Sequence, residues 1–307
     1  MSPRRGTAVA TALLLAALAA AGCGLGPGAD VGGVELTVTR EFGATPMLRR
    51  QVGDVTQSGT VMRVLEGNAK ITTRYGGGFV QSIEGIEEAQ RGGHPYDWFY
   101  FVDGIEAPIG AADNPLRGGE RIWWDYRDWA ATNHVPAVVG SWPAPFADGY
   151  EGKRHPVTVE CEGGGGACAQ VRGALEGEGV VIAAGSPGGA IRVLVGPWAR
   201  LRSDPAAAQV EAGPEQSGIY ADFERRGGGY ELRGLNAEGK PVGAFGPAAG
   251  LVAATRRYEG PPVWLVTGAT AAGVQAAAGL LDAHDLRDHY AVATEDGKET
   301  PLPVAVR

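Results

Sequence analysis

The stretch from Tyr96 to Trp129 constrains the fold of this chain more than any other. It holds four of the seven tryptophans, although aromatic residues make up only 7% of the 307-residue sequence. Two aromatic runs are separated by Gly, Pro, Asn and Asp, the residues that favour turns. Because aromatic side chains pack well on a pleated sheet, the pattern predicts two antiparallel strands and a tight connection between them.

The first of the two strands is apolar on both faces. Its even positions carry Trp98, Tyr100 and Val102, and its odd positions carry Phe99 and Phe101. Successive side chains of a strand point to opposite faces of the sheet. We therefore expect either a strand that is covered on both sides or one whose second face lines a ligand groove.

The segments before this pair predict further short elements of a β-rich domain, which we place at residues 34–132. Val34–Arg40 alternates apolar and polar residues, as a half-buried strand does. The run that begins at Thr60 (TVMRVLEGN) fits either a strand or a short helix. Phe79–Ile83 is a further expected strand, because a run of glycines and a turn signal enclose it.

The amino terminus has the features of an export signal. A positive start with Arg4 and Arg5 precedes an apolar run, Ala8–Ala21, that is too short for a comfortable membrane span. The AAGC motif that ends at Cys23 resembles the bacterial lipobox, which implies removal of residues 1–22 and attachment of lipid to Cys23. The lipobox more often has Leu where the first Ala of this motif stands, so an ordinary signal peptidase site is the alternative.

These features predict an exported protein, anchored by lipid to the outer face of the bacterial cell membrane, with the lipid bilayer as a partner through Cys23. Residues 23–33 are small and Gly-rich, as in a flexible tether. Loss of residues 1–22 leaves 25 Lys and Arg against 35 Asp and Glu, a net charge of −10. This acidic balance argues against nucleic acid as a partner, because nucleic acid requires clustered Lys and Arg.

The two other cysteines are an even pair for an oxidising compartment. Cys161 and Cys168 are separated by the flexible EGGGGA segment, which lets the two sulfurs meet and predicts a disulfide. Two free thiols or a metal pair are the alternatives. No nearby His and Cys complete a zinc set at suitable spacing.

The remainder of the chain divides by composition. Residues 133–156 carry four prolines and little periodicity, which predicts an ordered but irregular linker. Residues 157–307 are rich in Ala, Gly, Val and Leu and predict an α/β domain. With the β-rich first domain, the expected fold class is α+β.

Two parts of the predicted α/β domain, residues 157–245 and 246–307, are similar to each other. Each has an apolar strand, starting at Ile191 or Val263, then small residues, an Ala-rich helix and a second strand containing Tyr-Ala. A Gly-centred hairpin signal follows each unit, and an Ala-rich segment precedes it. Duplication of a β-α-β-β unit is one interpretation; a shared bias towards Ala and Gly is the other.

No motif carries a recognisable reaction, and we predict no cofactor and no enzymatic activity. Gly268–Gly273 has the glycine spacing of a phosphate-binding loop, but Val274 and Gln275 stand where Lys and Ser or Thr are required. The richest polar cluster is Asp282–His289. On a continuing helix it could hold a metal ion or an acid–base pair, whereas solvated charges on a turn after the helix are the favoured interpretation.

Four features of the first domain identify a family resemblance. They are the Gly-rich lead into the strand with Ile83, the WFYFVDG strand and turn, the Leu116-x-Gly-Gly-Glu connection, and the strand with Trp124-Asp-Tyr126. Residues 58–130 resemble bacterial extracellular domains of unknown function that are related to the carboxy-terminal domain of transcobalamin and intrinsic factor. The resemblance implies a β-grasp-like sheet and, from the animal relatives, a surface that closes over one face of cobalamin. The helical partner domain of those proteins is missing here.

The aromatic side chains are the candidate ligand-binding residues. Exposed aromatic surfaces commonly bind planar ligands or partners, but alternation means that these side chains cannot all face one way. We expect about half to form core and the rest to form an exposed face. The candidate set is Phe79, Tyr96, Trp98, Tyr100, Trp124 and Tyr126. The expected function is non-catalytic binding of a small molecule, with a corrinoid implied by the resemblance; a protein-interaction or cell-envelope scaffold module is the alternative.

Overall fold

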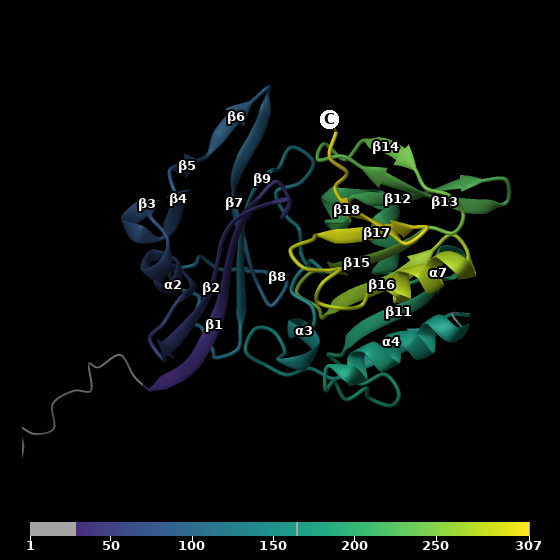
Figure 1. The fold of residues 1–307 in the computed structure, drawn as a ribbon, viewed down its shortest axis with the longest axis horizontal. Coiled ribbons are helices and arrows are strands. Elements are labelled where there is room, and N and C mark those ends of the chain that lie inside the picture. Colours follow the sequence, from purple (N-terminus) through teal and green to yellow (C-terminus); the bar gives the residue numbers. More distant parts are fainter. Residues whose placement is uncertain (1–28, 164, 307) are drawn as a thin grey trace, which may run out of the picture.

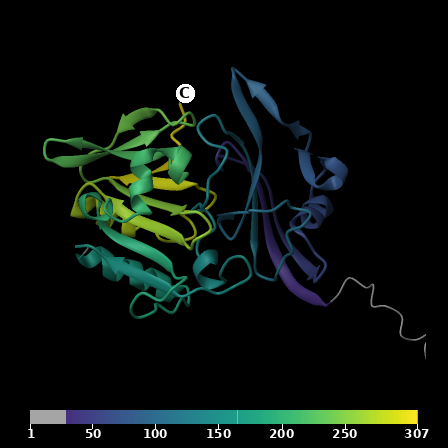
Figure 2. The same cartoon turned by 180° about the vertical axis from the view of Figure 1, so that it is seen from behind.

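The computed structural model describes residues 29–163 and 165–306. The predicted signal segment and Cys23 lie outside the described residues. The fold is α+β and rich in strands, as predicted. Two large sheets pack together with their covering elements (Figures 1 and 2), and we call residues 30–128 the first lobe and residues 157–306 the second lobe. Among the described residues, no helix is long and apolar enough to cross a membrane.

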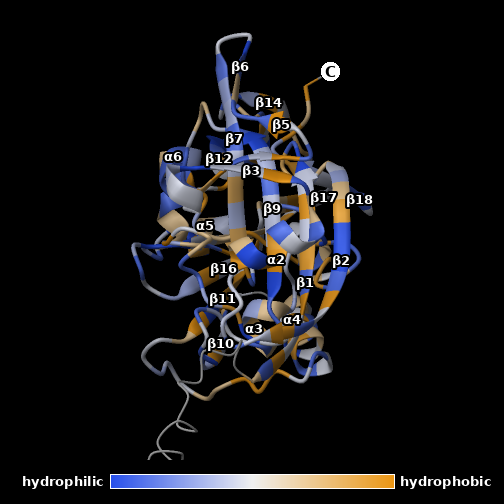
Figure 3. Ribbon diagram, turned by 90° about the vertical axis from the view of Figure 1, so that its left-hand side faces the viewer, coloured by the Kyte–Doolittle hydropathy of each residue, from blue (hydrophilic) through white to orange (hydrophobic). Residues whose placement is uncertain are grey.

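The first lobe is built on one mixed sheet with the strand order β2-β1-β9-β7-β6, and β8 also pairs with β7. Its central pair, β1 and β9, is parallel, whereas β7 runs antiparallel to β9. This is a β-grasp-like arrangement, and Figure 3 shows α2 in front of the sheet. The elements are β1 (Asp30–Arg40), β2 (Thr45–Thr56), α2 (Val61–Asn68), β3 (Ile71–Arg74), η1 (Tyr75–Gly77), β4 (Phe79–Ile83), β5 (Ile86–Glu87), β6 (Ala89–Arg91), β7 (His94–Val102), β8 (Ile105–Glu106) and β9 (Arg121–Asp128).

Two expectations for this lobe are resolved by local chemistry. The run from Thr60 is a helix, because the Thr60 side chain accepts a hydrogen bond from the Arg63 N–H at 3.3 Å and so caps α2. Its buried side chains, at positions 61, 62, 64 and 65, lie on one helical face. The predicted tether is too long at its carboxyl end: residues 30–33 already belong to β1, where Asp30 pairs with Thr56.

The second lobe has a six-stranded sheet of order β10-β11-β16-β15-β17-β18 and a separate sheet of order β12-β13-β14. The side chains of α4 and α7 share a core cluster with β10, β11 and β16. The elements are β10 (Val157–Cys161), α4 (Gly165–Gly177), β11 (Ile191–Pro197), α5 (Trp198–Leu201), η2 (Ala207–Ala212), α6 (Pro214–Ser217), β12 (Ala221–Arg226), β13 (Gly229–Leu235), β14 (Pro241–Ala244), β15 (Gly250–Arg256), β16 (Pro262–Gly268), α7 (Ala271–Ala278), β17 (Ala291–Glu295) and β18 (Lys298–Leu302).

The two predicted repeats share a strand, a helical connection and two further strands, but they differ in detail. After β16 there is one helix, α7, whereas β11 is followed by three short pieces, α5, η2 and α6, in place of the expected Ala-rich helix. The Ala-rich segments before the units are also not equivalent, because residues 167–175 lie in helix α4 and residues 250–256 form strand β15. The hairpin β12–β13 belongs to a separate sheet, while β17 and β18 extend the main one.

The Pro-rich segment, residues 133–156, is ordered and contains one short helix, α3 (Ala144–Ala147). It is also largely buried. Trp142 is 2% exposed, and its ring lies 5.7 Å from that of Trp264 in β16. Phe146 packs on the same indole at 4.9 Å. On the other side, Arg121 of β9 donates to the Trp142 carbonyl at 2.6 Å, so the segment contacts both lobes.

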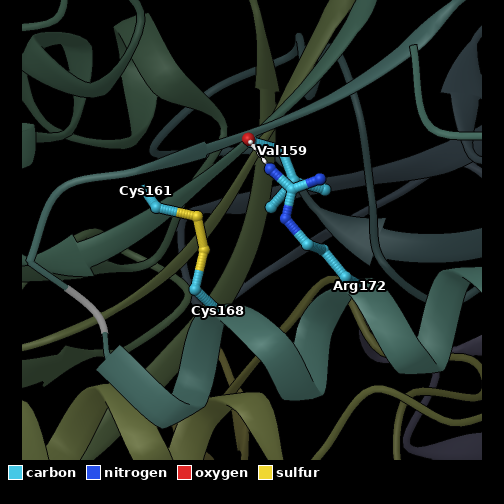
Figure 4. Close-up of a disulfide and its surroundings, with 4 residues drawn as sticks. All are labelled: Val159, Cys161, Cys168 and Arg172. Carbon is cyan, nitrogen blue, oxygen red and sulfur yellow. Dashed lines mark hydrogen bonds between the residues drawn. A yellow bond between two sulfur atoms is a disulfide. The ribbon is translucent and has the colours of Figure 1, made fainter. Parts of the chain in front are cut away.

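The predicted disulfide between Cys161 and Cys168 is confirmed. It joins the end of β10 to the first turns of α4 (Figure 4), with the two Cα atoms 6.1 Å apart. From the same helix, Arg172 donates a hydrogen bond to the Val159 carbonyl at 2.9 Å. The two links fix α4 on the edge strand of the second sheet.

Candidate functional site

An open hollow lies along the edge of β7, and we call it the β7 slot. Its volume is about 410 Å³, and it is lined by residues 78–80, 97–100, 106–107, 110–111, 124 and 133–134. The lining combines the aromatic strand pair with residues of β4, β8 and the Pro-rich segment. This volume lies within the range of small-molecule pockets.

The slot exists because β7 lacks a neighbour along part of one side. On its other side it pairs with β9 from Tyr96 to Val102. On the open side, β6 reaches only as far as Tyr96, and β8 begins its pairing at Phe101. Among the described residues, no strand pairs with the outer side of residues 97–100.

One side of the slot is aromatic and belongs to the first-lobe core. Trp98 and Trp124 are 5% and 3% exposed, and Tyr100 stacks on Trp124 with ring centroids 4.8 Å apart. Phe79 is 39% exposed and stands at the mouth. Burial raises the pKa of the Tyr100 hydroxyl to about 12, so this hydroxyl stays protonated and donates to the Ile109 carbonyl at 2.5 Å.

The other side of the slot is amphipathic. The Phe99 ring lies against the buried Arg127 guanidinium, whose central carbon is 3.8 Å from the ring centroid. Glu106 forms an ion pair with His134 and accepts a hydrogen bond from the Val135 N–H at 3.1 Å. The hydrogen bond to the Glu106 carboxylate raises the pKa of the His134 imidazole.

Four of the six candidate ligand-binding residues meet in the slot: Phe79, Trp98, Tyr100 and Trp124. The structure does not bring the other two, Tyr96 and Tyr126, into it. Those two rings stack on each other at 5.7 Å, and the Arg91 guanidinium lies over both, at 5.2 and 5.5 Å. The Tyr126 hydroxyl donates to the Glu87 carbonyl at 2.8 Å, which is a structural role.

Sequence reasoning missed the amphipathic side of the slot. Strand alternation correctly predicts that Phe99 and Trp98 lie on opposite faces of the sheet. Both nevertheless line the same hollow, because the edge of β7 is open there. Asn133 and His134 fall in the predicted linker, where no periodic pattern marks their partners. One sequence signal was available: the Asp103-Gly104 turn predicts a hairpin, and the strand that follows it, β8, is too short to cover the whole edge of β7.

A larger hollow, of about 510 Å³, lies in the second lobe beside β10 and β11. Its central cation, Arg192, forms two hydrogen bonds of 2.7 Å with Glu160 and one of 2.6 Å with Asp204. Two carboxylates thus already neutralise this guanidinium. These bonds link β10 and β11 to the loop after α5. Because its charge is already neutralised, Arg192 has no free positive charge to attract a ligand.

The polar run near the carboxyl terminus does not form the helical pairings considered for it, because α7 ends at Ala278. His284 is exposed and lies close to Asp282 and Asp285, at a spacing that a metal ion could bridge. These three residues, however, belong to one turn, in which the Asp282 carboxylate accepts hydrogen bonds from the His284 and Asp285 N–H groups at 2.7 and 2.9 Å. His289 is mostly buried, and burial lowers the pKa of its imidazole.

Comparison with known proteins adds one result. No curated protein matches the chain. Residues 58–128, from just before α2 to the end of β9, match the family model described as "Domain of unknown function (DUF4430)". The match includes every residue that lines the β7 slot except Asn133 and His134. The slot therefore lies largely within a domain that is similar to that family of unknown function.

Proposed function

We propose that this protein binds a small molecule in the β7 slot without catalysing a reaction. The observation that carries the proposal is the convergence of Phe79, Trp98, Tyr100 and Trp124, from three separate strands, on one hollow of about 410 Å³. Ligand sites are commonly lined by aromatic groups with a few fixed polar groups. The slot has this composition.

The polar groups of the slot support binding more than catalysis. Asp97 accepts the Trp98 N–H at 2.7 Å, and Glu106 holds the Val135 N–H and His134. Each carboxylate is thus engaged in holding the backbone around the slot. A general base needs a free position within hydrogen-bond reach of its substrate, which these contacts do not favour.

A corrinoid is the specific ligand that we propose to test first. The proposal rests on the resemblance of residues 58–130 to the transcobalamin-related domains. The exposed Phe79 ring at the mouth would contact the face of a planar ligand, and the buried aromatics would receive one of its edges. The proposed setting is the outer face of the bacterial cell membrane, with lipid on Cys23; labelled palmitate incorporated by the wild type but not by Cys23→Ala would support that anchor.

The test is a titration of the chain from Gly24 onward, which contains every described residue, with cobalamin. Tryptophan quenching beyond inner-filter absorption and heat in calorimetry are expected. Phe79→Ala should weaken this binding about tenfold, because the loss of one aromatic ring contact commonly lowers the affinity by about that factor. Tyr258→Ala is the matched control, since Tyr258 is an aromatic residue of the second lobe that is 89% exposed. Absence of both heat and quenching would reject a corrinoid.

A protein-interaction or envelope-scaffold role is the second candidate. One observation favours it: Tyr75 is 87% exposed and its ring lies 6.4 Å from that of Phe79, so two aromatic side chains project together at the slot mouth. Exposed aromatic pairs are typical of contact sites. An envelope protein that copurifies with the wild type and is lost from the Tyr75→Ala/Phe79→Ala double variant would favour this role.

A further inference from the structure

The open edge of β7 presents its backbone to the slot in a fixed pattern. The Pro95 carbonyl accepts from the Trp129 N–H at 3.0 Å, and the Asp103 N–H donates to the Arg121 carbonyl at 2.9 Å. Odd-numbered residues therefore direct their backbone groups towards β9. Backbone groups of successive strand residues point to opposite sides, so Trp98 and Tyr100 direct theirs into the slot.

Half of these edge groups already have partners. The Asp97 carboxylate accepts the Trp98 N–H at 2.7 Å, and the Tyr100 carbonyl accepts the Ala107 N–H at 3.4 Å. The Trp98 carbonyl and the Tyr100 N–H have no hydrogen-bond partner among the residues that the structure describes. One acceptor and one donor are thus left facing the slot.

The spacing of this acceptor and donor selects one kind of occupant. An antiparallel strand could reach the Trp98 carbonyl and the Tyr100 N–H only through two of its residues, because each residue faces a single residue opposite. The second backbone group of each would then face the Trp98 N–H or the Tyr100 carbonyl, which already have partners. In a parallel pair, one residue donates to the carbonyl of residue i and accepts from the N–H of residue i+2. The Trp98 carbonyl and the Tyr100 N–H are such a pair.

The lining of the slot agrees with an added strand. Side chains of a strand alternate between faces, and the slot is open to both faces of β7, with Trp98 and Tyr100 on one and Phe99 and His134 on the other. A planar ligand would occupy one face only. The unpaired edge, residues 97–100, is about 13 Å long at the usual rise of a strand, which matches a stretch of three to four residues.

We infer that the β7 slot binds a short extended peptide as a strand parallel to β7, which names the ligand class of the site proposed above and rests on that proposal. The central peptide residue donates its N–H to the Trp98 carbonyl and accepts from the Tyr100 N–H. Its side chain lies beside Phe99 and His134. The residues before and after it point to the aromatic side, so the favoured sequence is apolar–polar–apolar.

The experiment uses the chain from Gly24 onward, labelled with ¹⁵N-tyrosine, and a panel of blocked tripeptides with Phe, Leu or Val at the outer positions and Ser, Asp or Lys at the centre. The chain has nine tyrosines, and Tyr100→Phe identifies the Tyr100 amide signal. Binding should shift this signal. Replacing the central N–H by an ester oxygen should weaken binding about 3- to 10-fold, the size of one hydrogen bond.

Gly110→Leu should abolish peptide binding, because a Cβ at Gly110 meets only the Gly78 carbonyl, at 3.5 Å, and a larger side chain fills the slot. Gly243→Leu is the matched control, since a Cβ there meets nothing within 4 Å. If no tripeptide moves the Tyr100 signal but cobalamin binds and Gly110→Leu blocks it, the peptide inference fails and the small-molecule function stands. If Gly110→Leu alters no binding of either probe, the slot itself is rejected.

Discussion

The strand pair β7 and β9 carries aromatic side chains on both faces, but the two faces have different roles in the structure. The odd side chains of β7 face the second lobe, where Phe101 and Trp123 pack against Tyr290 at 5.5 and 5.4 Å. The even side chains face the first-lobe core and the slot. The difference lies in the polar groups that accompany each aromatic cluster.

On the inter-lobe face, one buried carboxylate organises the contact. Asp125 is 0% exposed and accepts from Thr39 Oγ1 at 2.6 Å, Phe42 N–H at 3.0 Å, Gly43 N–H at 3.2 Å and Tyr290 OH at 3.0 Å. The four donors come from both lobes and satisfy the carboxylate. At the open edge of β7, by contrast, the Trp98 carbonyl and the Tyr100 N–H lack partners among the described residues. Complete satisfaction of a buried carboxylate is typical of a structural joint, whereas unpaired backbone groups on an open strand edge are available for pairing with an added strand, as we propose.

The largest test of this comparison is Asp125→Ala. Removing the carboxylate leaves four buried donors without an acceptor, and breaking a buried network of this kind costs about 3–5 kcal/mol of unfolding free energy. Urea denaturation followed by tryptophan fluorescence measures the loss. Tyr290→Phe, which removes one donor and keeps the ring, should cost only about 1 kcal/mol. Equal losses in the two variants would contradict the central role of Asp125.

The turn at the end of β7 gives the second test, through pH. Burial raises the pKa of the Asp103 carboxyl to about 8 from its ordinary value of 3.8. The folded state therefore keeps a proton that the unfolded state releases above pH 4. The free energy of unfolding should fall as pH rises from about 4 to about 8, by at most about 1.4 kcal/mol per pH unit.

Asp103→Asn should remove this slope. Asp103 and Gly104 have φ values of 51° and 80°, and Asn-Gly suits such a turn as well as Asp-Gly. The Asn side-chain oxygen can still accept the Arg121 N–H, which lies 2.9 Å from the Asp103 carboxylate. Melting curves of both proteins between pH 5 and pH 9 should diverge as pH rises, with the variant more stable. Parallel curves would show that Asp103 is ionised in the folded protein at neutral pH.

Sequence patterns predict four strands of the first lobe, β1, β4, β7 and β9, because local alternation or an apolar run marks them, but they miss the long strand β2 and the short strands β3, β5, β6 and β8. The two-sided apolar pattern of β7 leaves two alternatives, cover on both faces or a groove, and residues 97–100 of this strand border the slot. The Cys161–Cys168 disulfide follows from an even pair of cysteines and the flexible segment between them. The TVMRVLEGN run is ambiguous because eight residues fit either period, and a single cap at Thr60 decides for the helix.

The parts that sequence does not predict depend on contacts between distant residues. Asp125 reads as one more polar residue of an aromatic strand until Thr39 and Tyr290 lie beside it. Tyr126 is a plausible ligand residue until Glu87 accepts its hydroxyl. The slot itself depends on where β6 ends and β8 begins, and boundaries of short strands are set by the turns and by tertiary packing.

A smaller test compares two tryptophans on the slot face. The Trp98 indole N–H donates to the Ile86 carbonyl at 2.8 Å, whereas the buried Trp124 indole nitrogen has no partner among the described residues. Phenylalanine in either position removes a similar volume. Trp98→Phe should therefore lose about 1 kcal/mol more unfolding free energy than Trp124→Phe. Equal losses in urea denaturation would mean that Trp124 has an acceptor too, such as an ordered water.

The smallest expected effect on stability comes from Phe79→Ala. Comparing this variant with one on the inter-lobe face tests most directly whether the two aromatic clusters differ in role. Because the Phe79 ring is 39% exposed, its removal should change the unfolding free energy by less than about 1 kcal/mol, while binding in the slot falls about tenfold. On the inter-lobe face, Phe101→Ala removes a ring that is 0% exposed and should cost about 3–5 kcal/mol. A Phe79 variant that melts well below the wild type would show that this ring stabilises the fold, and the slot would then lose the only exposed ring among the five Phe, Tyr and Trp residues that line it.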